Sequence, residues 1–200
     1  MNIVLFGMMA AGKTTVGERL ALAMRRPFVD TDRLIVERYG EITEIFERHG
    51  EGYFRTVEGE IVKELVQKDG QVIAVGGGLV LSEENVSLLK RNGKMVYLRG
   101  AVETLVGRLA GDKTRPLLRA DDVSLTGQVE KLLLARAPIY ERVADFTVDI
   151  DGKTPEKIAV EIMSKLQGKK LKRKGQVRDE NSFGDGRCAR NRQKYRFTIL

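Results

Sequence analysis

Strand-length apolar runs alternate with longer stretches of helical periodicity through most of this 200-residue chain. We expect strands at residues 3–6, 28–29, 72–75, 95–98 and 146–150. We expect helices at residues 13–25, 32–39, 42–49, 53–67, 83–92, 102–110, 125–143 and 155–167. Because parallel strands are joined by crossovers that are usually helical, this alternation is typical of an α/β domain with a parallel sheet.

The alternation fails in two segments. Residues 111–124 form a polar stretch that is either a plain connection or a mobile lid over a site. After Gln167 the chain is rich in Gly, Asn and Arg and has no apolar period, which predicts a largely disordered segment. We therefore expect one domain at residues 1–167 and a basic tail at residues 168–200.

The tail carries the excess positive charge that gives the chain its net charge of +7. Residues 168–200 contain eleven Lys or Arg and three Asp or Glu, whereas the other 167 residues contain 24 and 25. The basic pI therefore indicates no nucleic-acid-binding face on the domain. Only the tail fits non-specific contact with nucleic-acid phosphates.

The composition excludes several other kinds of protein. The single cysteine, Cys188, cannot form an internal disulfide, and the single histidine, His49, has no Cys/His cluster with which to bind a metal. No apolar run approaches the roughly 18 residues of a membrane helix, and the start of the chain lacks a basic signal-peptide region. We therefore expect a cytoplasmic protein that has no membrane partner, and we expect a monomer.

The most specific chemical motif runs from Gly7 to Thr14 and matches G-x-x-x-x-G-K-[ST] between an expected strand and an expected helix. A glycine-permitted loop that enters a helix N-terminus presents backbone N–H groups and the positive end of the helix dipole to phosphate oxygens. In such a loop Lys13 reaches the β- and γ-phosphates, and the Thr14 hydroxyl binds magnesium. The strand-loop-helix context disfavours the alternative of a glycine turn that happens to precede Lys-Thr.

Two carboxylates, Asp30 and Asp32, follow the second expected strand at the edge of the sheet where open α/β folds bind ligands. One of them can hold a magnesium ion while the other binds or deprotonates an acceptor hydroxyl. Either could instead simply cap the helix that opens at Arg33. We favour a site because the pair follows a phosphate loop.

Three glycines, Gly76 to Gly78, follow the third expected strand. Without Cβ atoms, and with positive φ allowed, they let the backbone approach a ligand closely, whereas an ordinary turn needs only one or two. Three arginines are further candidates, because a guanidinium can grip a carboxylate bidentately or neutralise a transferring phosphoryl group. They are Arg55, Arg115 and Arg136, whose spacing alone would leave them as solvated surface residues.

Six motifs together resemble those of shikimate kinases in their order and approximate spacing. They are Gly7 to Thr14, Asp30-Thr31-Asp32, Phe54-Arg55-x-x-Glu58, Gly76-Gly77-Gly78, Arg115-Pro116-Leu117-Leu118 and Arg136-x-Pro138-x-Tyr140. The resemblance covers residues 1–167. It implies a P-loop kinase fold of the nucleoside-monophosphate-kinase type, with a five-stranded parallel sheet in order 2-3-1-4-5. It also implies ATP-dependent phosphorylation of the shikimate 3-hydroxyl with Mg²⁺, a step in aromatic amino-acid biosynthesis.

The resemblance implies a role for each matching residue. Catalysis would rest on the phosphate lysine Lys13, on Asp32 as ligand of the shikimate hydroxyl and base, and on the lid arginine Arg115. ATP would be bound by Gly7, Ala10, Ala11, Gly12, Lys13, Thr14, Thr15, Arg108, Arg115 and Pro155. Shikimate would be bound by Asp32, Gly76, Gly77 and Gly78, and its carboxylate would be clamped by Arg55 and Arg136. Magnesium would be bound by Thr14 and Asp30.

Two features depart from the family pattern. The loop interior Met8-Met9-Ala10-Ala11 is unusually apolar, which matters little where the backbone binds phosphate. The basic tail has no counterpart in the family, so the resemblance implies nothing about it.

Other functions are alternatives to this one. Kinases of gluconate or of nucleoside monophosphates are related enzymes, and Phe54-Arg55 together with Arg136-x-Pro138 favours shikimate over both. The alternative from a different class is a P-loop nucleotide-dependent switch whose tail binds nucleic acid. Such a switch has no evident need for Asp32, Arg55 and Arg136 in their matching contexts.

Overall fold

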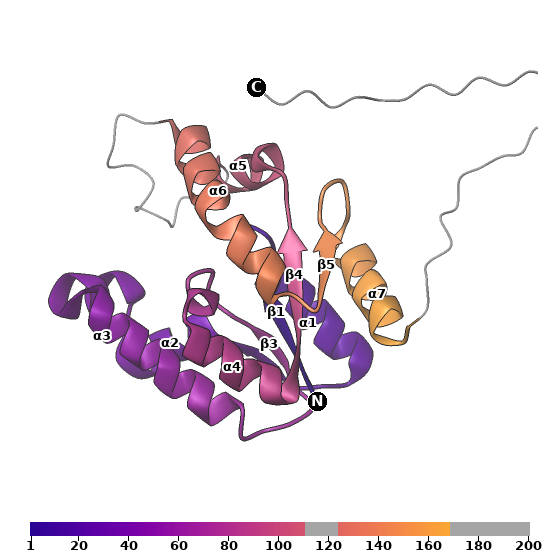
Figure 1. Cartoon of the computed structure of the whole chain (residues 1–200), viewed down its shortest axis with the longest axis horizontal. Helices are drawn as coiled ribbons and strands as arrows, with labels where there is room; N and C mark the ends of the chain where they lie inside the picture. Colours follow the sequence, from indigo (N-terminus) through magenta and orange to yellow (C-terminus); the bar gives the residue numbers. More distant parts are fainter. Residues whose placement is uncertain (111–123, 169–200) are drawn as a thin grey trace, which may run out of the picture.

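Five parallel strands form one sheet in the order β2-β3-β1-β4-β5 in the computed structural model, which describes residues 1–110 and 124–168 (Figure 1). The strands are β1 (Asn2–Phe6), β2 (Phe28–Asp30), β3 (Val72–Ala74), β4 (Gly93–Arg99) and β5 (Phe146–Asp149). The helices of the described residues are α1 (Lys13–Met24), α2 (Thr31–Tyr39), α3 (Ile42–Leu65), α4 (Glu83–Asn92), α5 (Val102–Ala110), α6 (Leu125–Val143) and α7 (Pro155–Leu166). The strand order confirms the expected topology.

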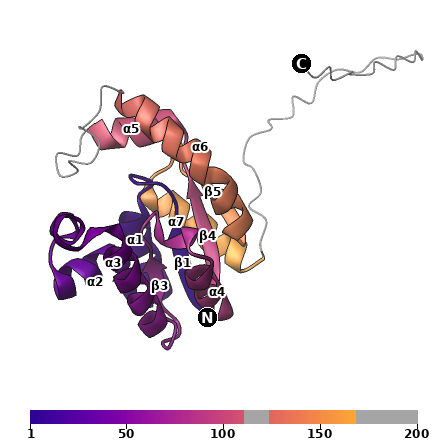
Figure 2. The ribbon, with the colours of Figure 1, turned by 60° about the vertical axis from the view of Figure 1, so that its left-hand side comes forward.

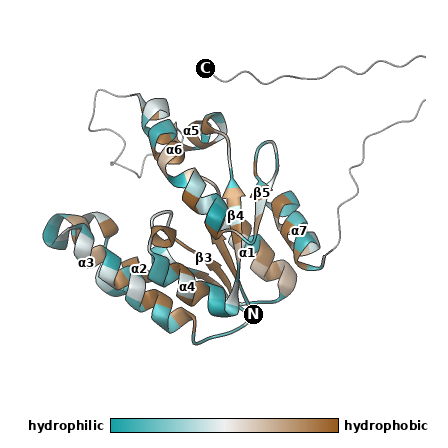
Figure 3. Cartoon of the chain, in the orientation of Figure 1, coloured by the Kyte–Doolittle hydropathy of each residue, from teal (hydrophilic) through white to brown (hydrophobic). Residues whose placement is uncertain are grey.

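The centre of the sheet is buried on both faces. All five residues of β1 are buried, and because neighbouring residues of a strand point to opposite faces, both faces must be covered. Helices α1 and α7 pack together on one face, while α3, α4 and α6 lie on the other (Figures 1 and 2). The strands are apolar throughout their centres and the helices are apolar on one side only, which is typical of this layered arrangement (Figure 3).

Side-chain caps fix where several helices begin. Asp30, Ser82, Ser124 and Thr154 cap α2, α4, α6 and α7, and each accepts a hydrogen bond from a backbone N–H of the first turn. Helix α1 differs, because its N-cap is Gly12 in the left-handed conformation (φ 84°) and no side chain caps its first N–H groups. This leaves the start of α1 suited to an external anion.

The expected boundaries hold closely. The expected helices at residues 42–49 and 53–67 run together as α3, but Gly50 between them is not helical (φ 77°, ψ 175°) and divides α3 into two helices across a kink. The structure thus agrees with the expectation of two helical segments that meet near Gly50. A 3₁₀ turn, η1 (Leu79–Leu81), follows the three glycines and was not predicted.

Arg115, most of the polar stretch at residues 111–124 and residues 169–200 of the tail lie outside the described residues. Within the part of the chain that is described, no helix is long and apolar enough to cross a membrane.

Candidate active site

The loop between β1 and α1 turns through residues with positive φ. Gly7 (φ 150°) and Gly12 (φ 84°) take two of these positions, and a Cβ at Gly7 would lie 2.5 Å from the carbonyl oxygen of Leu98. Ala10 takes a third (φ 60°) although it carries a Cβ, which stores local strain. The loop therefore bends back over the N-terminus of α1, where backbone N–H groups gather for an anion.

Two cations lie over this loop. The Lys13 Nζ donates hydrogen bonds to the carbonyl oxygens of Gly7 (3.2 Å) and Met8 (3.0 Å). The Arg108 Nη1 donates to the carbonyl oxygen of Ala10 at 3.2 Å, from helix α5. Both side chains thus place positive charge at the expected phosphate site.

The Asp30 carboxylate serves two segments at once. Its Oδ2 accepts a hydrogen bond from the Thr14 hydroxyl at 2.6 Å, while its Oδ1 accepts from the N–H groups of Asp32 (3.0 Å) and Arg33 (3.4 Å). The capping interpretation is therefore confirmed for Asp30, while its second oxygen is hydrogen-bonded to Thr14, the other residue predicted to bind magnesium. Asp32 does not cap α2.

A cavity of about 140 Å³ lies between the phosphate loop and the ends of β2 and β3. Its lining consists of Ala10, Gly12, Lys13, Thr14, Thr15, Asp30, Asp32, Ala74 and Val75. The phosphate lysine and both carboxylates therefore face one space, although they come from separate parts of the sequence. Ala11 does not line it and is fully buried.

Each of the three glycines after β3 is approached by a different polar side chain. A Cβ at Gly76 would lie 2.7 Å from Asp32 Oδ1, one at Gly77 would lie 3.7 Å from Arg136 Nη1, and one at Gly78 would lie 2.6 Å from Arg55 Nη1. None of the three has a positive φ, so of the two properties of glycine that the sequence suggested, only the missing Cβ is used here. A Cβ at Gly76 or Gly78 would clash with the Asp32 or Arg55 side chain unless that side chain moved away from the loop.

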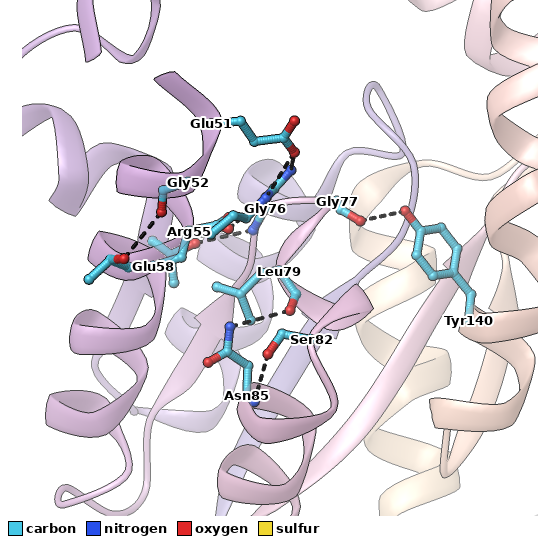
Figure 4. A network of polar contacts seen from close by, with 12 residues as sticks. Glu51, Gly52, Arg55, Glu58, Gly76, Gly77, Leu79, Ser82, Asn85 and Tyr140 are labelled. Atoms are coloured by element: carbon cyan, nitrogen blue, oxygen red, sulfur yellow. Dashed lines mark hydrogen bonds and ion pairs between the residues drawn. The ribbon is translucent and has the colours of Figure 1, made fainter. Parts of the chain in front are cut away.

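Arg55 is held between two carboxylates of α3 (Figure 4). Its Nη1 donates to Glu58 Oε2 at 2.6 Å and its Nη2 donates to Glu51 Oε1 at 2.8 Å. The Glu58 side chain is 2% exposed, whereas that of Glu51 is 65% exposed. Burial raises the pKa of Glu58, the neighbouring Asp32 carboxylate adds to the rise, and the charge of Arg55 opposes it.

Glu58 is thus a buried counter-charge that fixes the position of Arg55. It belongs to one of the sequence motifs but had no predicted role. The signal was available, because residues three apart on a helix share a face and an Arg-Glu pair at that spacing can form an ion pair.

Helix α6 brings Tyr140 to the other side of the glycines from Arg55 (Figure 4), and Arg136 lies one helical turn before Tyr140 on the same helix. The buried Tyr140 hydroxyl donates to the Gly77 carbonyl oxygen at 2.6 Å, and a Cβ at Gly77 would lie 3.4 Å from this hydroxyl and 3.7 Å from Arg136 Nη1. Tyr140 also belonged to a motif without a predicted role. The structure therefore places Arg55 and Arg136, from α3 and α6, on two sides of one loop.

A second cavity, of about 640 Å³, opens between α3 and α4. Arg55, Glu58 and Gly78 line it, whereas Asp32 and Arg136 do not. Gly76 lies between a residue of each cavity, since a Cβ there would lie 2.7 Å from Asp32 Oδ1 and 3.4 Å from Glu58 Oε1. The predicted acceptor residues thus converge on the glycine loop, and the larger cavity extends away from it.

Pro155 is the first residue of α7, which packs against α1. An ion pair between Arg19 and Glu156 (3.1 Å) links these two helices. Pro155 does not line the cavity at the phosphate loop. The structure therefore places it beside the predicted nucleotide-binding helix and not in the cavity itself.

Comparison with known proteins identifies a family. The model of a family described as shikimate kinase matches residues 9–167. The shikimate kinase of Pseudomonas syringae pv. tomato is 41% identical over 166 residues, covering 82% of this chain and 95% of that protein. The shikimate kinase of Caldanaerobacter subterraneus subsp. tengcongensis is 40% identical over 172 residues, covering 84% and 99%. The solved structure of shikimate kinase from Acinetobacter baumannii in complex with shikimate has a TM-score of 0.78 and 38% identity, covering 86% and 95%.

Proposed function

The chain belongs to the shikimate kinase family, and from this premise we infer that it transfers the terminal phosphoryl group of ATP to the 3-hydroxyl of shikimate. The products are ADP and shikimate 3-phosphate, in a step of aromatic amino-acid biosynthesis. One observation carries the assignment: Asp32, Arg136 and Arg55 lie against three successive glycines beside a phosphate loop. Phosphorylation of an anionic acceptor needs this set, because catalysis of phosphoryl transfer consists mainly of positioning and charge neutralisation.

On the nucleotide side, the backbone of the phosphate loop would bind the phosphates. The contributing residues are Gly7, Ala10, Ala11, Gly12, Lys13, Thr14 and Thr15. The positive φ values of the loop and its entry into α1 support this role, because they gather N–H groups at one point. The Lys13 ammonium, already within 3.2 Å of two loop carbonyls, would neutralise charge on the transferring group.

Thr14 and Asp30 fit a magnesium ion. Their side-chain oxygens lie 2.6 Å apart in one cavity with the phosphate lysine, and hydroxyl and carboxylate oxygens are ligands that Mg²⁺ prefers. The described residues hold no cluster of three or more His, Cys, Asp or Glu that could bind a metal without phosphate or water. This fits an ion that reaches the protein with its nucleotide. When bound, Mg²⁺ would neutralise developing charge on the phosphates.

On the acceptor side, Asp32 would bind the 3-hydroxyl and take its proton as the oxygen–phosphorus bond forms and the bond to ADP breaks. Its place in the cavity that the phosphate lysine also lines, and against Gly76, supports this role. Arg55 and Arg136 would grip the substrate carboxylate, one from each side of Gly76 to Gly78. The glycines would present backbone groups to shikimate at close range, since no Cβ intervenes.

Three further assignments concern groups at the edge of this site. Arg108, which contacts the loop at Ala10, and Pro155, at the start of α7, would lie near the adenine. Arg115 stays a prediction as the lid arginine. A monomeric state, a cytoplasmic location and a tail that takes no part in catalysis also stay predictions from the sequence.

The test is ADP release by the full chain in the presence of Mg-ATP, with and without shikimate. We expect turnover to depend on shikimate, with much slower release when gluconate or a nucleoside monophosphate replaces it. Lys13→Met provides the matched control, because it removes the phosphate cation while leaving the acceptor residues in place. Shikimate-independent ADP release, or a stronger response to another acceptor, would overturn the assignment.

A further inference from the structure

The Tyr140 hydroxyl is a buried meeting point of three parts of the site. It donates to the Gly77 carbonyl oxygen at 2.6 Å and lies 3.9 Å from the Met8 sulfur of the phosphate loop. The Arg136 guanidinium, one helical turn away on α6, approaches the same glycine, since a Cβ at Gly77 would lie 3.4 Å from the Tyr140 hydroxyl and 3.7 Å from Arg136 Nη1. One hydroxyl therefore links the phosphate loop, the glycine loop and a predicted substrate arginine.

Packing alone already fixes the Tyr140 ring. The ring is fully buried and makes edge contacts with Phe6 (centroids 5.7 Å apart) and Tyr97 (5.2 Å), and these two rings stack on each other at 5.6 Å. Phe6 and Tyr97 belong to neighbouring central strands, β1 and β4. The hydroxyl is thus carried at a fixed position by the rigid core of the sheet.

The hydroxyl in turn fixes a peptide plane. Gly76 is anchored by its N–H to Thr31 Oγ1 at 3.1 Å and by its carbonyl to the N–H of Leu79 at 3.1 Å. Its neighbour Gly77 has no side chain to pack, and its carbonyl oxygen is held by Tyr140. Because the peptide unit is planar and trans, directing this carbonyl to Tyr140 aims the N–H of Gly78 in the opposite direction, away from α6.

We propose that Tyr140 is a positioning residue for the acceptor, which acts by orienting the Gly77–Gly78 peptide and the Arg136 guanidinium without touching shikimate. The proposal rests on the proposed function. The proposal also explains why residue 8 is apolar. Met8 is 1% exposed and its sulfur faces the Tyr140 hydroxyl, so the Met8 side chain packs around this hydroxyl and does not contact phosphate.

The chemistry of the hydroxyl suits this role. Burial raises the pKa of Tyr140, and the nearby charge of Arg136 only partly opposes the rise. The group therefore stays protonated through the neutral range and keeps its O–H donor for Gly77. Phenylalanine would fill the same space, lose this hydrogen bond and remove the polar oxygen beside Arg136.

The test compares Tyr140→Phe with Tyr97→Phe. Tyr97 is a matched control, because it is 1% exposed, belongs to the same aromatic cluster and would also lose one hydroxyl. We expect Tyr140→Phe to raise KM for shikimate about three- to tenfold, the loss of one net hydrogen bond, with KM for ATP within about twofold of wild type. Tyr97→Phe should leave both values within about twofold.

A double-mutant cycle with Arg136→Lys separates positioning from simple loss of stability. If Tyr140 acts partly through Arg136, the two changes together should raise KM for shikimate by less than the product of their separate effects. For a destabilised variant, the rise in melting temperature caused by shikimate and, separately, by ADP reports binding to the folded protein. A selective loss of the shikimate effect supports the proposal.

The proposal is overturned if Tyr140→Phe leaves KM for shikimate unchanged, weakens ATP equally, or matches Tyr97→Phe. These outcomes differ from a failure of the proposed function. In that case the wild-type protein itself would show no shikimate-dependent turnover.

Discussion

Replacement of Arg136 by lysine gives the sharpest test of how the acceptor is held. The change keeps the positive charge but removes the planar fork that can bind a carboxylate with two parallel hydrogen bonds. In the structure this fork lies beside Gly77 and close to the Tyr140 hydroxyl, since a Cβ at Gly77 would lie 3.7 Å from Arg136 Nη1 and 3.4 Å from that hydroxyl. A lysine ammonium on a flexible stem cannot reproduce the two parallel hydrogen bonds.

The size of the effect follows from the hydrogen bond that lysine cannot make. A hydrogen bond to a charged group contributes about 1.5 to 3 kcal/mol, and lysine would forfeit one of the two to the substrate carboxylate. Since about 1.4 kcal/mol corresponds to a factor of ten, KM for shikimate should rise by about one to two orders of magnitude. KM for ATP should change little, because Arg136 does not line the cavity at the phosphate loop.

Steady-state ADP release with each substrate varied in turn provides the measurement, and titration of shikimate into protein without nucleotide checks that KM follows affinity. Arg142→Lys is the matched control. Arg142 lies on the same helix, but its side chain is 69% exposed and makes only a surface ion pair of 3.8 Å with Glu83. The carboxylate clamp would be refuted if Arg136→Lys raised KM for ATP as much as KM for shikimate. It would also be refuted if Arg142→Lys raised KM for shikimate as much as Arg136→Lys does.

Three further predictions follow from the same geometry. Lys13→Met should cost about 3 to 5 kcal/mol of transition-state stabilisation in kcat/KM while the protein stays folded, and near wild-type turnover by a folded variant would contradict the role of the lysine. Asp32→Asn should lower kcat far more than nucleotide affinity, because the amide keeps the size of the side chain but cannot take the proton. Single-turnover rates and ADP titrations would measure the two effects, and equal losses of rate and of ADP affinity would indicate a merely structural role. Truncation after Gln167 should preserve kinase activity and cooperative melting, because α7 ends at Leu166; loss of either in calorimetry and ADP release would make the tail part of the fold.

Local patterns in the sequence were enough for the elements and for the phosphate loop. Apolar runs and helical periods are properties of neighbouring residues, so the expected strands and most helix ends agreed with the structure. The order of the strands in the sheet came instead from the family resemblance, and it also agreed. The loop from Gly7 to Thr14 is contiguous, and its chemistry is carried by backbone and adjacent side chains. Asp30 makes one local and one long-range contact. Its cap on α2 involves neighbouring residues, whereas its hydrogen bond to Thr14 forms only because the sheet places β2 beside the phosphate loop.

The backbone conformation of single residues was harder to predict from the sequence. The glycines Gly76 to Gly78 were identified as a binding loop, but none of them takes the positive φ that glycine allows, whereas Ala10 takes such a conformation without being glycine. Backbone angles at these positions depend on what surrounds the loop. The nearby oxygen and nitrogen atoms of Asp32 and Arg55, with which a Cβ would clash, come from distant segments.

The sequence by itself therefore determined the layered α/β fold, the phosphate loop and the identities of the charged candidates. Only the tertiary structure decided how these candidates meet: that the local pair of Arg55 and Glu58 lies against Gly78 and Gly76, and that Tyr140 holds Gly77 from a helix 63 residues further along the chain. The physical reason is that periodicity and turn chemistry act between neighbours in the chain. Crossovers of a parallel sheet bring residues from β1, β2, β3, α3 and α6 to one edge, and no local signal encodes which side chains then touch.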